Sequence, residues 1–268
     1  MHAVAALRRR QPYHMTTEEL KETAEFISEY ATCLLGSGVH TSRVLRNSTR
    51  ICDALGVGIQ MTTLSKTIVI TVFDAHEGTS HTEVLSIPAL PISFEYNADL
   101  SELSWDVYDN RMPLREIKER YREIVSRPKM SRYMILLLVG LANGAFCRLF
   151  NGAWGAVVIV VLATWLGVFV RQEMQKRKVN HFIVFIVSAF VASMFASLSL
   201  IPGWTPNTAI GTSVLFLIPG VPLINGIIDI IDGHTLTGVS RLINAMLLII
   251  CVAVGLSVPL LLFVKNLL

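Results

Sequence analysis

Hydrophobic and polar residues follow different patterns in the two halves of the chain. Over about residues 16–125, apolar positions alternate or recur every three to four residues, whereas from Tyr133 onwards they form long uncharged runs. The first pattern is typical of soluble helices and strands, and runs of about 20 apolar residues are typical of transmembrane helices. The sequence therefore predicts an α+β domain at 15–128, followed by an all-α membrane domain at 131–268.

The first half contains start and stop signals for helices and strands. Thr16-Thr17 supplies a hydroxyl N-cap before acidic residues, Asn97 or Ser101 is the expected cap of a later helix, and Pro113 suits the first turn of another. Gly56 is expected to end a helix. The predicted helices span about 17–35, 41–55, 97–108 and 113–125, and the predicted strands span about 57–63, 67–73 and 82–87.

The second half contains five apolar runs, which predict five transmembrane helices. Their expected bounds are 133–150, 153–170, 182–201, 209–228 and 242–264. A basic loop at 171–178 separates the second span from the third. An odd number of spans cannot form two equal membrane halves, which is how many transporters build a central site. We therefore expect a small multispan partner subunit, a homo-oligomer, or both.

Positive residues predict the orientation in a plasma (inner) membrane. Lys and Arg cluster before the first span, at 171–178 and at Arg241, whereas the loops near Asn151 and Pro202 contain none. Because positive loops stay in the cytoplasm, the N-terminus is expected inside and the C-terminus outside. No apolar run follows the arginines near Met1, which argues against a signal peptide and places the first domain in the cytoplasm.

Composition agrees with a membrane protein. The chain is 52% hydrophobic and only 16% charged, and residues 131–268 hold 8 basic and 3 acidic side chains. A soluble domain has about 25% charged residues. The four cysteines have no metal-ligand or disulfide-scaffold spacing. We expect no metal, no cofactor and no nucleic-acid partner.

The fourth span contains the sequence Pro219-Gly220-Val221-Pro222. Both prolines lack the N–H that would bond the carbonyls of Leu215 and Ile218, so a break in the helix is predicted. Broken helices frame substrate sites in many transporters, which makes Pro219, Gly220, Pro222 and Asn225 candidate pathway residues. The alternative is a structural kink packed against a neighbouring helix.

Ionisable residues follow this break. Asp229 and Asp232 are three residues apart, so a helix would place them on one face, where they could share a proton or pair with Arg241. They are candidates for proton or charge handling. Alternatively, they lie at the membrane interface without a role in transport.

Three features of the first half are candidate sites. The loop Gly36–Thr41 opens a helix and could hold an anion through Gly38, Thr41 and Arg43, or it is simply a tight helix connection. The row of Arg43, Arg46 and Arg50 could face acidic partners or lipid head groups, or only solvent. Acidic and histidine side chains at 74–83 read as a solvated hairpin, with a metal site as the alternative.

Catalytic motifs are not evident. The sequence lacks a phosphate-binding loop of the Walker type and a Ser-His-Asp constellation, so neither ATP hydrolysis nor covalent catalysis is indicated and we expect no enzyme. Coupling to a proton gradient is the remaining hypothesis for energy input.

Several segments resemble the threonine/serine exporter family. They are Gly38-Val39-His40-Thr41-Ser42-Arg43-Val44, Ile68-Val69-Ile70-Thr71-Val72, Pro113-Leu114, and Ile218 to Gly226 with Asp229. Longer family members have about ten spans, so this chain resembles the larger subunit of the split form, whose second short polypeptide supplies the other half. The resemblance implies export of succinate for the split form, or of threonine and serine for the fused form.

The resemblance leads us to expect a proton-coupled exporter subunit for a small polar amino acid or a dicarboxylate. An anionic substrate would favour Arg241 and the N–H groups of the glycine loop. The alternatives are a membrane-anchored enzyme that uses the 74–83 cluster, and a sensor domain that the helices only anchor.

Overall fold

The structure is a computed structural model that describes residues 15–128, 130–200 and 204–263. It divides into two compact units. Unit 1 combines the chain up to Arg127 with Val221–Leu242, and unit 2 combines Pro128–Gly220 with the chain from Ile243. The arginines near Met1 and the predicted span ends at Ile201 and Val264 lie outside the described residues.

Unit 1 contains the helices and strands expected in the first half, together with elements from the second. Its helices α2 and α3 pack on one face of a three-stranded antiparallel sheet with the strand order β1-β2-β3. The elements are α2 (Thr17–Gly36), α3 (Thr41–Leu55), β1 (Gly58–Leu64), β2 (Thr67–Phe73), β3 (Ser80–Ser86), α4 (Phe94–Asn110), α5 (Leu114–Ser126), α10 (Gly220–Ile231) and the first turns of α11 (Thr235–Phe263).

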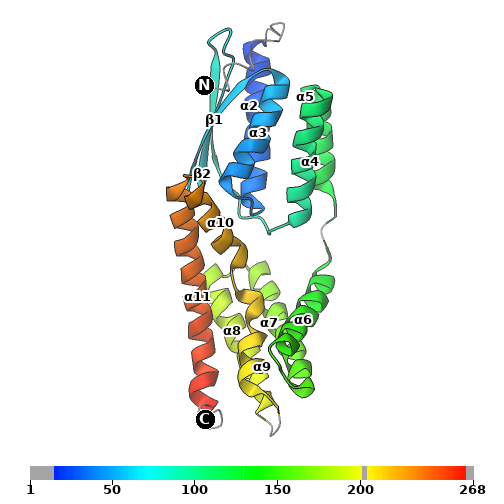
Figure 1. Ribbon diagram of the computed structural model, residues 1–268, viewed down its shortest axis with the longest axis vertical. Coiled ribbons are helices and arrows are strands. Elements are labelled where there is room, and N and C mark those ends of the chain that lie inside the picture. The colour runs from blue at the N-terminus through cyan, green and yellow to red at the C-terminus, as the bar shows by residue number, and fades with distance from the viewer. Residues whose placement is uncertain (1–14, 129, 201–203, 264–268) are drawn as a thin grey trace. The chain divides into compact units, whose positions relative to one another are not determined.

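The core of unit 1 lies between the sheet and its helices. Alternate residues of the central strand, Ile68, Ile70 and Val72, are fully buried, as expected for a strand with one face on a core. Helices α2 and α3 cover this face, and α4 and α5 form a further layer on the other side of them (Figure 1). The burial of these apolar side chains is the main favourable contribution to folding of the unit.

Helix caps explain where the helices of unit 1 begin and end. Thr16 and Glu19 form the capping box of α2, and Gly56 ends α3 with a left-handed backbone, both as predicted. The predicted cap of α4 is wrong. Ser93 accepts the Tyr96 N–H and starts the helix at Phe94, while Asn97 is buried inside it and bonds Ser37.

Unit 2 is helical. It contains α6 (Arg132–Leu149), α7 (Trp154–Lys176), α8 (His181–Ala196), the 3-10 turn Ser197–Ser199, α9 (Pro206–Ser213), the 3-10 turn Leu215–Leu217 and the remainder of α11. Glycines lie where helices approach closely: a Cβ at Gly144 would meet the Val161 side chain, and one at Gly255 would meet the backbone of α8. Small residues at such contacts are typical of membrane helix packing.

The predicted loop at 171–178 is shorter than expected. Helix α7 continues to Lys176, because residues 171–176 are good helix formers and Glu173 pairs with Arg177 one turn later at 3.6 Å. The turn before α8 therefore contains only Arg177–Asn180.

Four described helices are long and apolar enough to cross a membrane, namely Arg132–Leu149, Trp154–Lys176, His181–Ser199 and Thr235–Phe263. A fifth span results if the bent pair Pro206–Leu217 and Gly220–Ile231 counts as one, with a bend of 61°. The five predicted spans are matched only under that count.

Candidate functional site

The predicted break occurs at Pro219. The chain leaves the 3-10 turn at Leu217, Ile218 is extended, and α10 begins at Gly220. Pro222 has a different effect from the one predicted. It lies in the first turn of α10, where an N–H has no helical partner, and the Ile218 carbonyl instead accepts the Gly220 N–H at 2.9 Å. Pro219 is therefore the residue that interrupts the helix.

An arginine binds the backbone at this break. The Arg171 guanidinium donates from Nη1 to the Phe216 carbonyl at 3.2 Å and lies 5.2 Å from the Phe185 ring centroid. A carbonyl released by a helix break needs a partner at membrane depth. Sequence reasoning missed this role, since it counted Arg171 only as a loop charge. The available signal was an arginine directly after an apolar run.

Asp229 is one of two buried acids among the described residues of unit 1, the other being Asp74 in the 74–83 segment. The Asp229 side chain is fully buried, and Oδ1 accepts the Thr41 backbone N–H at 2.8 Å. Oδ2 lies 3.1 Å from Arg241 Nη1, forming an ion pair. Arg241 also donates from Nη2 to the Val39 carbonyl at 3.1 Å. The carboxylate is thus held by a helix N-terminus and a guanidinium, two partners that favour negative charge.

Asn225 joins the same cluster one helical turn earlier. Its Nδ2 donates to the Gly38 carbonyl at 2.7 Å. Gly38 has φ +92, a left-handed conformation that favours glycine, and this turns the loop toward α10. The predicted anion loop and the predicted charge-handling residues therefore form one site, which we call the Asp229 cluster: Gly38, Val39, Thr41, Asn225, Asp229 and Arg241.

Other predicted residues lie outside this cluster. Asp232 is exposed, although it is only three residues from Asp229, and Arg43 is half-buried on α3. Pro219 and Gly220 belong to unit 2. Arg50 contacts Trp105, with its guanidinium 3.7 Å from the ring centroid, and bonds Asn47, so it is not simply a solvated charge.

Close packing of two helices aligns Asp229 with Arg241. A Cβ at Gly238 on α11 would lie 2.6 Å from the Gly226 carbonyl oxygen on α10, so the helices approach at a distance that glycine permits. The tip of the β1–β2 hairpin holds α11 from the other side. Thr237 shares a 2.9 Å hydrogen bond with Thr63, and Ser240 bonds Ser65 at 2.8 Å.

The cluster retains unused hydrogen-bonding capacity. Thr41 Oγ1 and His40 Nδ1 are buried atoms without a hydrogen-bond partner among the described residues, whereas Asp229 Oδ2 has its ion pair with Arg241. Burial lowers the pKa of the His40 imidazole, and Arg46 acts in the same direction, so a neutral ring is favoured there. Such unpaired groups are costly unless a function retains them.

The 74–83 segment forms the turn between β2 and β3 at 74–79 and the first residues of β3 at 80–83, as the hairpin interpretation predicted. Asp74 accepts the His76 N–H at 2.8 Å, and His81 Nε2 lies 2.7 Å from Glu83 Oε1. Across the described ranges, no group of three or more His, Cys, Asp or Glu side chains is placed to hold a metal ion.

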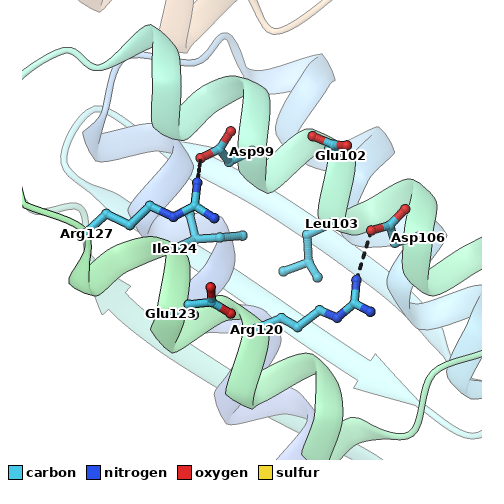
Figure 2. A pocket seen from close by; sticks show the side chains of 8 residues that line it. All are labelled: Asp99, Glu102, Leu103, Asp106, Arg120, Glu123, Ile124 and Arg127. Atoms are coloured by element: carbon cyan, nitrogen blue, oxygen red, sulfur yellow. Dashed lines mark hydrogen bonds and ion pairs between the residues drawn. The ribbon is translucent and has the colours of Figure 1, made fainter.

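Figure 2 shows a surface groove between α4 and α5. Arg127 pairs with Asp99 at 2.6 Å, and Arg120 pairs with Asp106 at 3.0 Å. Because these side chains are well exposed, their pairing adds little to stability. The groove is a solvated surface between two helices, crossed by these two ion pairs.

Comparison with known proteins identifies the family. The sequence matches the threonine/serine exporter family (ThrE) over residues 25–263, which is most of the chain. The chain belongs to the threonine/serine exporter family. This agrees with the resemblance carried by the sequence motifs, and the spanning helices agree with a multi-pass membrane transporter.

Curated members of the threonine/serine exporter family differ in length. The chain is 29% identical to "Probable succinate transporter subunit YjjP" of Klebsiella aerogenes and of Escherichia coli K12, covering 88% and 90% of this chain and 92% and 94% of those proteins. It is 23% identical to "Probable threonine/serine exporter" of Mycobacterium tuberculosis, covering 86% of this chain but 44% of that protein. No solved structure matches.

Proposed function

We propose that this chain is the larger subunit of a two-component exporter that moves a small carboxylate metabolite out of the cell. Succinate is the first candidate and threonine or serine the second. The observation that carries the proposal is the ion pair between the buried Asp229, on the second half of the broken span, and Arg241 on the helix that follows it. The succinate assignment is supported by relatives of that printed name, which align along nearly their whole length.

The broken span supplies the pathway in this proposal. At Pro219 the backbone leaves the helix, and Gly220, Pro222 and Asn225 follow in the first turns of α10. Discontinuous helices present backbone groups to a substrate in many secondary transporters. Asn225, with its carboxamide already bonded to the loop at Gly38, links this pathway to the Asp229 cluster.

Asp229 carries the proton in this proposal, with Arg241 and the exposed Asp232 as the neighbouring charges. A proton that binds Asp229 Oδ2 neutralises the acid and leaves Arg241 without its ion-pair partner. The guanidinium is then available to another anion. An ionisable residue within a membrane segment is by default a functional candidate, which supports this role.

The same contacts support the proposed orientation in the membrane. The end of α10 and the start of α11 bind the α2–α3 loop, which supports a location of these ends on the side of the α+β domain. Arg177 and Lys178 lie in the turn before α8 and, with Arg241, favour the cytoplasm for that side. In this topology the N-terminus is inside, the C-terminus is outside and the membrane is the plasma (inner) membrane.

A second membrane subunit completes the transporter in this proposal. The relatives from Klebsiella and Escherichia are named subunits, and more than half of the mycobacterial exporter has no counterpart in this chain. A small multispan protein would supply that part. The alternative is a homo-oligomer of the present chain, and the experiment below distinguishes it from a complex with a second subunit.

The test is efflux of labelled substrates. Cells are preloaded with succinate, threonine or serine and make this chain alone, a candidate multispan partner alone, or both. We expect export only with both, and export of succinate above the amino acids. Export by this chain alone would replace the two-component proposal with a homo-oligomer. Membrane-inserted chain and partner that export none of the three would refute the proposal.

A further inference from the structure

The Asp229 carboxylate occupies a position with the properties of a ligand site. It lies at the N-terminus of α3, a helix of 15 residues, where it accepts the Thr41 N–H, and it faces the Arg241 guanidinium. Both groups recognise a carboxylate of any origin, because they respond to negative charge and to acceptor geometry. The carboxylate comes from a residue 188 positions away in the sequence.

The residues around the Asp229 carboxylate offer more hydrogen-bonding groups than this carboxylate uses. Thr41 Oγ1 belongs to a residue that is 1% exposed and has no partner among the described residues, and Asp229 Oδ2 meets Arg241 without a hydrogen bond. A purely structural cap would be expected to satisfy its neighbours, since a buried unsatisfied polar group is costly. The unused hydroxyl points to a second occupant with more acceptor atoms.

We propose that Asp229 is an internal stand-in for the carboxylate of the transported molecule. The substrate carboxylate takes the same position, accepting from the Thr41 N–H and hydroxyl and pairing with Arg241, while Asp229 is displaced. The inference rests on the proposed function and adds the residues that bind the substrate's carboxylate. Every candidate substrate, whether succinate, threonine or serine, contains this group.

The first test removes the charge of the stand-in. In purified full-length protein, Asp229→Asn replaces the anion by a neutral amide of the same shape, so the substrate competes with a weaker occupant. If Asp229 fills the site nine-tenths of the time, succinate should bind about tenfold more tightly to the variant than to the native chain. Unchanged or weaker binding would overturn the proposal.

The second test removes the Thr41 N–H that donates to the carboxylate. It does not depend on whether Asp229→Asn folds. Thr41 is the first residue of α3, where proline is well tolerated, and His40 before it is extended, which suits a residue preceding proline. Thr41→Pro deletes the N–H, whereas the matched control Thr41→Ala deletes only the hydroxyl. Asp229 loses the same N–H in Thr41→Pro and then competes less well for the site. We therefore expect succinate to bind about twofold more weakly to Thr41→Pro than to Thr41→Ala.

Equal affinity of these two variants would overturn the inference. Failure of this inference can be distinguished from failure of the proposed function. A native chain that exports succinate with its partner, while Thr41→Pro and Thr41→Ala bind it equally, keeps the function and rejects the stand-in. Threonine serves as the second probe in both tests, because a zwitterion shares the carboxylate but lacks the second negative charge.

Discussion

Two polar clusters of unit 1 show that density of ionisable residues in sequence is a poor guide to a site. The 74–83 turn brings five acidic or histidine residues within ten positions, yet His81 and Glu83 pair locally and remain about 30% exposed. The Asp229 cluster combines six residues from the α2–α3 connection, α10 and α11, and its acid is fully buried. Burial, rather than proximity in sequence, strengthens an electrostatic interaction and makes an unpaired group costly.

The largest expected effect is on efflux, which should depend on the Asp229 cluster and not on the 74–83 turn. Asp229→Asn is expected to reduce efflux to the level of cells without the chain, at unchanged membrane abundance, because the variant can neither carry a proton nor exchange charge with Arg241. The matched control is Glu83→Gln, which removes an acid from the turn and should leave efflux unchanged. Efflux of labelled succinate and immunoblots of membranes measure both quantities. Normal efflux by Asp229→Asn would remove Asp229 from the mechanism.

Local structure was the predictable part of the molecule. The Thr16 cap, the Gly56 stop and the alternation of Ile68, Ile70 and Val72 depend on neighbours within a few residues, so the sequence pattern contains them. Even here a competing hydroxyl misled the prediction, since Ser93 caps α4 in place of Asn97 or Ser101. Several residues offer the same capping chemistry, and tertiary packing selects one.

The site was predicted in fragments. The glycine loop suggested a possible anion contact at Thr41, and helical spacing suggested that Asp229 could pair with Arg241, but neither pattern could show that one carboxylate contacts both. That contact depends on how α10 and α11 pack against the α2–α3 loop. Asp232 illustrates the limit: helical spacing placed it with Asp229, whereas the structure exposes it.

A second prediction concerns close helix packing. We expect the Asp229 cluster to depend on it, in contrast to the 74–83 turn. Gly238→Ala places a methyl group 2.6 Å from the Gly226 carbonyl oxygen and 2.9 Å from the Ile230 nitrogen, both of which are backbone atoms. We expect a loss of stability of about 1–3 kcal/mol, typical of overpacking, and reduced efflux. Thermal unfolding of the purified chain measures the first effect.

The control for this variant is Gly211→Ala. Gly211 lies in α9 and has nothing within 4 Å of an added Cβ. Alanine there should be neutral or slightly stabilising, since it favours a helix more than glycine does. Equal stability of the Gly238 and Gly211 variants would show that α10 and α11 tolerate a wider separation and that their close approach does not maintain the cluster.

The smallest effect concerns His40, which precedes Thr41 and has its pKa lowered by burial and by Arg46. Because the folded chain binds the proton less readily than the unfolded chain, this residue's contribution to stability is complete above a pH of about 6.5 and declines as the pH falls below it. His40→Gln should remove that part of the acid-side decline in unfolding temperature between pH 8 and pH 5. If His40→Gln follows the native pH profile, proton binding at His40 does not contribute to the acid-side decline, and the electrostatic difference between the clusters does not extend to this residue.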